Sequence, residues 1–294
     1  MAYEKAKVYF DGGHYIAIPK EHYQRGVRRN THKTQQEVKG SPTREKFEIA
    51  YTESKELPKK ERKEYIKEVM QDSFSSKKET NEFVTQELER KRKNSNRRKT
   101  RLYRKVYLQE WTHFVTITYA DELHTEDSFR EKLRNTLKHL VSRKGWKYIG
   151  VFERSPENKR LHFHAIIYIP QMIGELVKAK DYSTKTKRMQ VTNQNTHFLK
   201  HFGRNDFKEL KRNEEVTMSV RYLMKYIDKT GEKLMFGGKL PTYFEADIDD
   251  IDVVCPIGNG DKKLLLFDDF TLWLDWCLVG KVSKETIKQM PKAN

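Results

Sequence analysis

Cysteine is scarce in this sequence, with two among 294 residues. Cys255 and Cys277 form no CxxC pair and stand at no zinc-ligand spacing from a histidine, so we expect no zinc cluster and a reducing environment. Long apolar runs are also missing. No stretch approaches the roughly 18 residues of a membrane span, and the N-terminus lacks the apolar segment of a secretion signal. We therefore expect a cytoplasmic protein without a membrane partner.

Acidic residues are outnumbered, with 42 Asp and Glu against 59 Lys and Arg and a net charge of +17. Solubility alone needs less charge than this. A polyanion releases condensed counterions when cations neutralise its phosphates, so such an excess favours its binding. A nucleic acid is therefore the expected partner.

Apolar clusters are few in the first hundred residues, and Lys55–Lys105 has the pattern of long charged helices. Between Glu87 and Lys105 there are ten Lys or Arg and two Glu. Such a run is either a DNA-backbone footprint or a solvated helix face, and we predict DNA contact. The predicted DNA-binding residues are Arg97, Arg98, Lys99, Arg101 and Arg104.

The composition changes at Trp111, where a compact domain begins. HFVTITY, KYIGVFER and LHFHAIIYIP are rich in β-branched and aromatic residues, which predicts three strands, the last of them closed by Pro170. Ser128–Ser142 places apolar residues at helical spacing between the first two strands. The polar SPENKR predicts a hairpin turn between the second and third strands.

The remainder divides into a polar segment, a helix and a C-terminal extension. Gln171–Glu215 predicts an insertion with short elements, and Val216–Thr230 predicts a helix with Gly231 at its αL cap position. We expect an α+β protein in three successive parts. These are a helical, basic N-terminal arm (1–105), a catalytic domain (106–235) and a small packed C-terminal extension (236–294).

His162-Phe163-His164 is the sharpest local motif. Residues two apart on a strand project to one face, and neutral imidazoles are ready metal ligands. Two structural histidines are the plain alternative. Glu153 is the only acidic residue in KYIGVFER, and a hairpin centred on Glu157 and Asn158 places it directly opposite His162. A register slip of one residue would turn it to the other face.

Two imidazoles and one carboxylate leave open coordination positions for phosphate oxygens. This set suits Mg²⁺ or Mn²⁺ acting as a Lewis acid. We therefore predict a metal site formed by His162, His164 and Glu153.

RYLMKYIDK places Tyr222 and Tyr226 four apart on the predicted helix, each followed three residues later by a lysine, Lys225 or Lys229. The tyrosines and lysines are expected on the side away from the apolar stripe, which argues against mere core filling. A phenol beside an ammonium group is a plausible nucleophile, because the cation favours phenolate and neutralises phosphate charge. Solvated amphipathic tyrosines are the alternative.

The three motifs resemble those of the HUH (histidine, hydrophobic, histidine) rolling-circle replication initiators. HFVTITY looks like their first motif and LHFHAII like their metal motif. RYLMKYIDK is similar to the tyrosine motif of the two-tyrosine initiators of microviruses and related single-stranded DNA phages. The motifs occur in the expected order between Trp111 and Gly231.

The resemblance implies an antiparallel sheet flanked by helices, with the histidine strand central. It assigns His162 and His164 as metal ligands, and Glu153 less securely because the third ligand varies among these enzymes. It assigns Tyr222 and Tyr226 as nucleophiles. One tyrosine would attack origin DNA, leaving a 5′-phosphotyrosyl link and a free 3′-OH. The second would cut the regenerated site and release a unit-length strand.

Lys225 and Lys229 take phosphate-side roles under the same resemblance. The expected partner is single-stranded origin DNA, with or without a hairpin, in a bacterial host cytoplasm. Gly237-Gly238-Lys239 is followed by Leu240 and lacks the hydroxyl of a P-loop, so unwinding and synthesis would come from a host helicase and polymerase.

Three functions remain open. The first is a replication initiator, and the second is a mobilisation relaxase or single-strand transposase with the same chemistry on other DNA. The third is a non-catalytic basic DNA-binding regulator. An acidic segment fits no EF-hand and is expected to be a solvated or partner-facing surface. Its residues are Glu245, Asp247, Asp249, Asp250 and Asp252.

Overall fold

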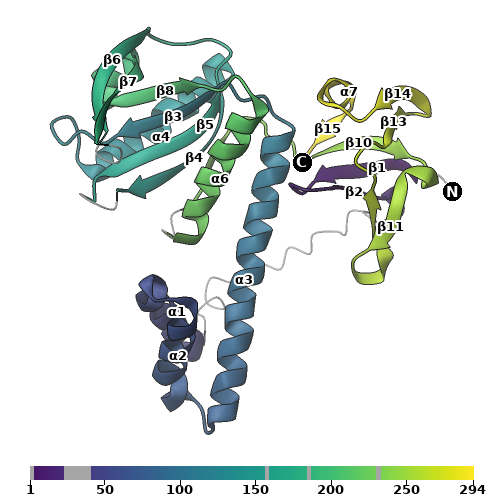
Figure 1. The fold of residues 1–294 in the computed structure, drawn as a ribbon, viewed down its shortest axis with the longest axis horizontal. Coiled ribbons are helices and arrows are strands. Elements are labelled where there is room, and N and C mark those ends of the chain that lie inside the picture. Colours follow the sequence, from purple (N-terminus) through teal and green to yellow (C-terminus); the bar gives the residue numbers. More distant parts are fainter. Residues whose placement is uncertain (1–2, 23–40, 156–158, 184–186, 230–232) are drawn as a thin grey trace. The chain divides into compact units, whose positions relative to one another are not determined.

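The computed structural model describes residues 3–22, 41–155, 159–183, 187–229 and 233–294. The chain divides into two compact units, one of residues 1–22 and 99–294 and one of residues 23–98. Figure 1 shows the elements of both. Among the described residues no helix combines the length and apolarity needed to cross a bilayer.

The unit of residues 23–98 is helical. It contains α1 (Pro42–Glu53), α2 (Lys59–Met70) and the first part of α3 (Lys77–Tyr107). Ser41 caps α1, and Pro42 occupies the first turn, where its missing N–H has no intrahelical partner to lose. The helices bury a small core of their own, made of Phe47, Ala50, Ile66, Met70 and Val84. The predicted charged helices are thus confirmed over α2 and α3.

A five-stranded antiparallel sheet forms the centre of the other unit. Its strand order is β8-β3-β5-β4-β9, so the histidine strand β5 is central. The strands are β3 (His113–Thr118), β4 (Lys147–Arg154), β5 (Leu161–Tyr168), β8 (Asn205–Glu209) and β9 (Met235–Gly237). The three strands predicted from the apolar segments are β3, β4 and β5. The mixed architecture with antiparallel sheets agrees with the expected α+β class.

Both faces of this sheet are covered, because successive residues of β5 project to opposite sides. Phe163 and Ala165 pack in one cluster with α4 (Glu126–Lys144) and α5 (Thr196–Phe202). Ile166 packs in another with α6 (Asn213–Lys229) and the end of α3. His162 and His164 have the parity of Ile166 and so face α6.

Gly150 of β4 makes room for this packing. A Cβ there would lie 2.3 Å from the ring of Phe163. The close approach of β4 and β5 therefore depends on glycine at this position.

The polar segment after Pro170 is more ordered than its composition predicts. β6 (Leu176–Ser183) and β7 (Arg188–Asn195) pair as a two-stranded antiparallel ribbon. α5 and β8 follow, and β8 pairs with β3 as an edge of the central sheet. The expected insertion with short elements is therefore wrong for β6 and β7, whose eight-residue strands form a regular hairpin. Their polar side chains hide the alternation, because one face of the ribbon is solvent-exposed.

A second sheet joins the two ends of the chain. β1 (Tyr3–Phe10) pairs with β10 (Tyr243–Ile248) and with β2 (Tyr15–Ile18). The strand order is β11-β12-β2-β1-β10-β13-β14, and β15 pairs with β10. The remaining elements are β11 (Val253–Ile257), β12 (Lys263–Leu266), β13 (Thr271–Leu274), β14 (Cys277–Lys281), α7 (Lys284–Gln289) and β15 (Lys292–Ala293).

This pairing corrects two expectations. The N-terminal arm is not helical from residue 1, and the C-terminal extension is not a separate last part, since β1 and β2 complete its sheet. Ala6 and Val8 are fully buried in the shared core, while Lys5 and Lys7 face outward. A short stretch that alternates alanine or valine with lysine carries a weak strand signal by itself.

The acidic segment is likewise not a wholly solvated surface. Asp247 is 2% exposed and accepts hydrogen bonds from the backbone N–H groups of Lys5 and Trp276, both at 2.8 Å. Asp252 is also buried and accepts from the N–H of Thr271 at 3.1 Å. These carboxylates satisfy loop backbone that would otherwise be buried without partners.

Candidate functional site

Three adjacent strands bring the predicted site residues together. Glu153 of β4 is directly paired with His162 of β5, as the hairpin register predicts. On the other side of β5, Thr118 of β3 is paired with His162, and Thr116 with His164. Paired residues of neighbouring strands share a face, so these five side chains form one polar patch on the face toward α6.

The two threonines orient the imidazoles. Thr116 Oγ1 lies 3.0 Å from His164 Nδ1, and Thr118 Oγ1 lies 3.1 Å from His162 Nδ1. With each Nδ1 engaged by a hydroxyl, Nε2 is the nitrogen directed toward a ligand. The residues Thr116 and Thr118 were missed in the sequence, although HFVTITY alternates them with apolar residues in the way that marks a half-buried strand.

Glu153 is placed against the second histidine. Its Oε2 lies 3.0 Å from His164 Nε2, and both residues are 8% exposed. Within the described residues, no three His, Cys, Asp or Glu side chains are arranged to hold a metal ion. The three predicted ligands are therefore neighbours, but the carboxylate contacts His164 instead of converging with both imidazoles on one point.

The electrostatics keep His162 in the form that a metal requires. Burial lowers the pKa of His162 to about 4, and the positive charges of His164, Arg160 and Arg204 act in the same direction against Glu153. The imidazole is therefore neutral near pH 7. A neutral imidazole nitrogen is a ligand for a divalent cation, so the donor chemistry of the patch fits Mg²⁺ or Mn²⁺.

Tyr222 reaches the same patch from α6. Its hydroxyl lies 3.3 Å from Glu153 Oε2 and 3.5 Å from His164 Nε2. Its ring packs edge-on to His164, at 5.2 Å between centroids, and to Phe114 at 5.7 Å. The expectation that this tyrosine lies on the side away from the apolar stripe is wrong. It flanks the stripe, and its long side chain reaches back to the sheet and the cluster that Val220 and Leu223 join.

The other members of the tyrosine motif are described less fully. Tyr226 and Lys229 lie on α6, but their side chains fall outside the described residues, as does the predicted cap at Gly231. Lys225 is exposed. The described geometry therefore brings one of the two tyrosines to the histidines.

One known family matches this part of the chain. Residues 112–231 match the family model for the replication-associated protein ORF2. A rolling-circle replication initiator is the kind of protein indicated. The matched segment covers β3 through α6, and so includes every residue of the patch. Searches of curated proteins and of solved structures gave no significant match.

Asp206 is a further acidic residue at this replication-protein site. It is paired with Thr116 across β8 and β3, in the same row of the sheet as His164. Burial raises the pKa of the Asp206 carboxyl, against a hydrogen bond that it accepts from the N–H of Asn193 at 3.0 Å. No sequence signal pointed to it, because β8 lies in the polar segment that was expected to be irregular.

The predicted DNA-binding run on α3 divides into two kinds of residue. Arg97, Arg98 and Arg101 are exposed, and Lys99 is half-buried. Arg104 instead forms an ion pair with Asp11, with Nη2 3.1 Å from Oδ2, and its guanidinium lies 4.2 Å from the ring centre of Tyr9.

We therefore expect Arg104→Ala to destabilise the fold by about 2 kcal/mol, the typical loss for a charged hydrogen-bonded contact. Urea denaturation followed by circular dichroism measures this loss. Arg101→Ala is the matched control and should leave the midpoint unchanged. An unchanged midpoint for Arg104→Ala would return this residue to the DNA-binding set.

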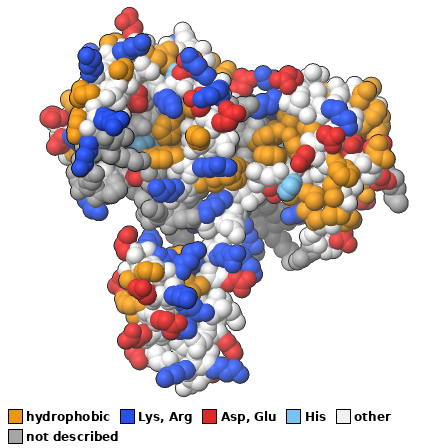
Figure 2. Space-filling model, in the orientation of Figure 1, with side chains coloured by type: hydrophobic (Ala, Val, Ile, Leu, Met, Phe, Trp, Pro, Cys, Tyr) orange, Lys and Arg blue, Asp and Glu red, His pale blue; other side chains and the backbone are white. Residues whose placement is uncertain are grey.

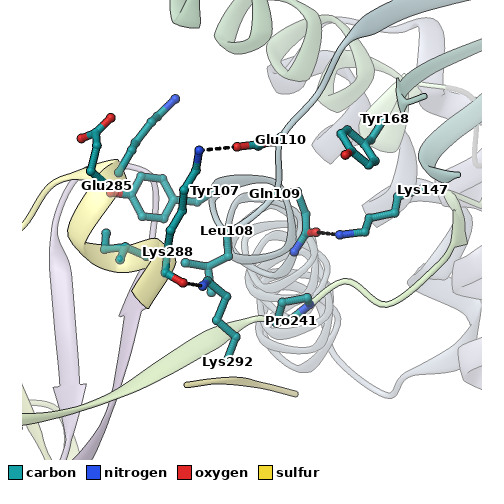
Figure 3. A pocket seen from close by; sticks show the side chains of 12 residues that line it. Tyr107, Leu108, Gln109, Glu110, Lys147, Tyr168, Pro241, Glu285, Lys288 and Lys292 are labelled. Atoms are coloured by element: carbon teal, nitrogen blue, oxygen red, sulfur yellow. Dashed lines mark hydrogen bonds and ion pairs between the residues drawn. The ribbon is translucent and has the colours of Figure 1, made fainter. Parts of the chain in front are cut away.

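A cavity of about 480 Å³ lies elsewhere in the same unit (Figure 3). Its lysines are held by oxygens of the chain itself. Lys288 pairs with Glu110 at 2.5 Å, Lys147 donates to Gln109 Oε1 at 2.9 Å, and Lys292 donates to the carbonyl of Lys288 at 2.9 Å. None of the predicted catalytic residues lines it, and we assign it no part in the chemistry.

Proposed function

We propose that the chain nicks single-stranded origin DNA by tyrosine attack and so starts rolling-circle replication. The observation that carries this proposal is the hydroxyl of Tyr222 beside Glu153 and His164 on paired strands. A phenol, a carboxylate and two imidazoles at one place supply a nucleophile, a proton acceptor and metal ligands. The family match over residues 112–231 supports the same conclusion.

In the proposed step, the phenol oxygen of a tyrosine forms a bond to phosphorus while the bond from phosphorus to the 3′ oxygen breaks. The phenol loses its proton, and Glu153 is the nearest described acceptor at 3.3 Å. The departing 3′ oxygen takes up a proton and becomes the 3′-OH that a polymerase extends. The products are a 5′-phosphotyrosine and a primer end, so atoms and charge balance without a redox partner.

His162, His164 and Glu153 are the residues that would hold Mg²⁺ or Mn²⁺. Such an ion, when bound, polarises the phosphate under attack. Lys225 and Lys229 are proposed to neutralise phosphate charge, and Tyr226 to be the second nucleophile, which would let the enzyme close and release a unit-length circle. Host helicase and polymerase are the proposed partners.

The decisive experiment uses end-labelled single strands of the chain's own genome with Mn²⁺. A denaturation-resistant protein–DNA adduct whose peptide carries phosphotyrosine is the expected result. Cleavage at a transfer origin or transposon end instead would identify a relaxase or transposase. Binding without any adduct would identify a non-catalytic regulator and overturn the proposal.

The threonines offer a test of the metal ligands. Thr116→Val and Thr118→Val keep side-chain volume and remove the hydroxyl at Nδ1, so we expect the apparent affinity for Mn²⁺ to fall roughly 10–100-fold. Nicking is titrated with Mn²⁺ at saturating DNA, and Thr116→Ser and Thr118→Ser should restore wild-type behaviour. Equal metal dependence in the valine and serine variants would show that the hydroxyls do not orient the ligands.

The exposed basic residues of α3 are expected to contact phosphate. Replacing Arg97, Arg98, Lys99 and Arg101 with Ala should weaken binding of all sequences alike and reduce the salt slope by about 0.7 for each lost contact on a single strand. Fluorescence anisotropy at several salt concentrations measures this slope. An unchanged slope would mean that the run is a solvated helix face.

A further inference from the structure

The β6–β7 ribbon carries an exposed face of unusual composition. Tyr182 is paired with Met189, and Lys180 with Val191, so these four side chains share one face. Tyr182 is 52% exposed, Met189 62% and Val191 64%. Apolar and aromatic side chains gathered in this way on a soluble protein usually mark an interaction surface.

The charge of this face is entirely positive. Lys178 has the same strand parity as Lys180, and both are exposed. Asp181 is the only acidic residue between 176 and 195, and it lies on the opposite face, where it pairs with Arg204 at 2.6 Å. Lys187 and Arg188 add positive charge near the tip. Figure 2 shows hydrophobic and basic side chains intermixed on the side of the molecule where the ribbon lies.

The ribbon is fastened beside the catalytic patch. The N–H of Asn193 donates to Asp206 at 3.0 Å, and the N–H of Asn195 donates to Asn205 Oδ1 at 2.7 Å. Asp206 is in the same row of the sheet as Thr116 and His164. Figure 1 shows β6 and β7 continuing outward from β8. A strand bound at the histidines thus has the ribbon as its neighbouring surface.

We propose that this face, which we call the ribbon face, binds single-stranded DNA next to the cleaved phosphate. Tyr182 offers a stacking surface for a base, Met189 and Val191 extend it, and Lys178 and Lys180 contact phosphates. Aromatic side chains interleaved with cations are what sequence-tolerant single-strand binding requires. An apolar protein partner would not use the lysines, which favours DNA as the occupant. The inference rests on the proposed function for the position of the strand, but not for its binding.

The test measures binding of fluorescein-labelled oligo(dT) of graded length by anisotropy, with the full chain in EDTA so that no cleavage occurs. Tyr182→Ala should weaken binding of the longer strands roughly tenfold, whereas Tyr182→Phe retains the ring and the affinity. Lys178→Ala with Lys180→Ala should reduce the salt slope by about 0.7 for each lysine. The shortest strands should bind all variants alike.

Val177→Ala is the matched control, because Val177 is 49% exposed on the opposite face of the same ribbon. Its binding should equal that of the wild type. Circular dichroism checks that each variant is folded. Equal affinity of Tyr182→Ala and wild type at every length would overturn the proposal. So would a wild-type dimer that Tyr182→Ala dissociates without loss of DNA affinity, which would give the face to a second copy of the chain.

The two proposals fail separately. A chain that binds oligo(dT) through the ribbon face but forms no phosphotyrosine loses the proposed function and keeps this inference. A chain that forms the adduct while every ribbon variant binds normally keeps the function and loses the ribbon face.

Discussion

Replacing His162 or His164 with Ala is expected to abolish nicking while leaving most of the DNA affinity. The lost step is the metal-assisted attack, for which the ion supplies several kcal/mol, so the rate should fall by at least about 10³-fold. Binding rests on many phosphate contacts spread over a basic surface and should change little. Adduct formation with Mn²⁺ measures the first effect, and anisotropy in EDTA measures the second.

His139→Ala is the matched control, since His139 is exposed on α4, remote in sequence from the motif. It should nick like the wild type. His164 is buried against Glu153, so thermal unfolding must accompany the assay for that variant. Strong nicking by either His162→Ala or His164→Ala in the presence of a chelator would rule out the metal assignment.

The double variant Tyr222→Phe with Tyr226→Phe is expected to form no covalent adduct at all. Phenylalanine keeps the packing of Tyr222 against Phe114 and deletes the oxygen that attacks phosphorus. Each single variant should retain some cleavage, because the two positions are one helical turn apart and a small shift of strand or side chain presents either phenol to the same phosphate.

Release of unit-length product separates the single variants from the wild type. Closing a circle needs a second cleavage while the first phosphotyrosine is still loaded, so each single variant should start replication and fail at termination in a coupled assay. Tyr168→Phe, a half-buried tyrosine of β5 outside the motif, is the control and should behave normally. Full initiation and termination by one single variant would make the chain a one-tyrosine enzyme.

Local patterns predicted the central part of the fold well. The pairing of Glu153 with His162 follows from a short hairpin, whose turn sets the register of both strands. α4 and α6 follow from apolar residues at helical spacing. In each of these cases, the residues that decide the structure are near one another in the sequence.

The missed features depend on partners that are distant in sequence. β1 alternates small apolar residues with lysines and becomes recognisable only beside β10, with Val8 opposite Phe244. Asp247 looks like a solvated acid until the N–H groups of Lys5 and Trp276 are brought to it. Tyr222 was placed on the wrong side because a helical wheel shows where a side chain leaves the helix, not where its ring ends.

The pairing of β1 with β10 also sets the order in which the chain folds during synthesis. Tyr3 emerges from the ribosome first, but its partner Ile248 follows only after nearly all of the central sheet has been made. At about 5–20 residues per second, the first strands wait roughly 10–50 s without a partner. Fusing a bulky domain ahead of Tyr3, or stopping translation before β10, should therefore leave an unpaired β-edge exposed and promote aggregation, although the helices and the histidine strands are complete.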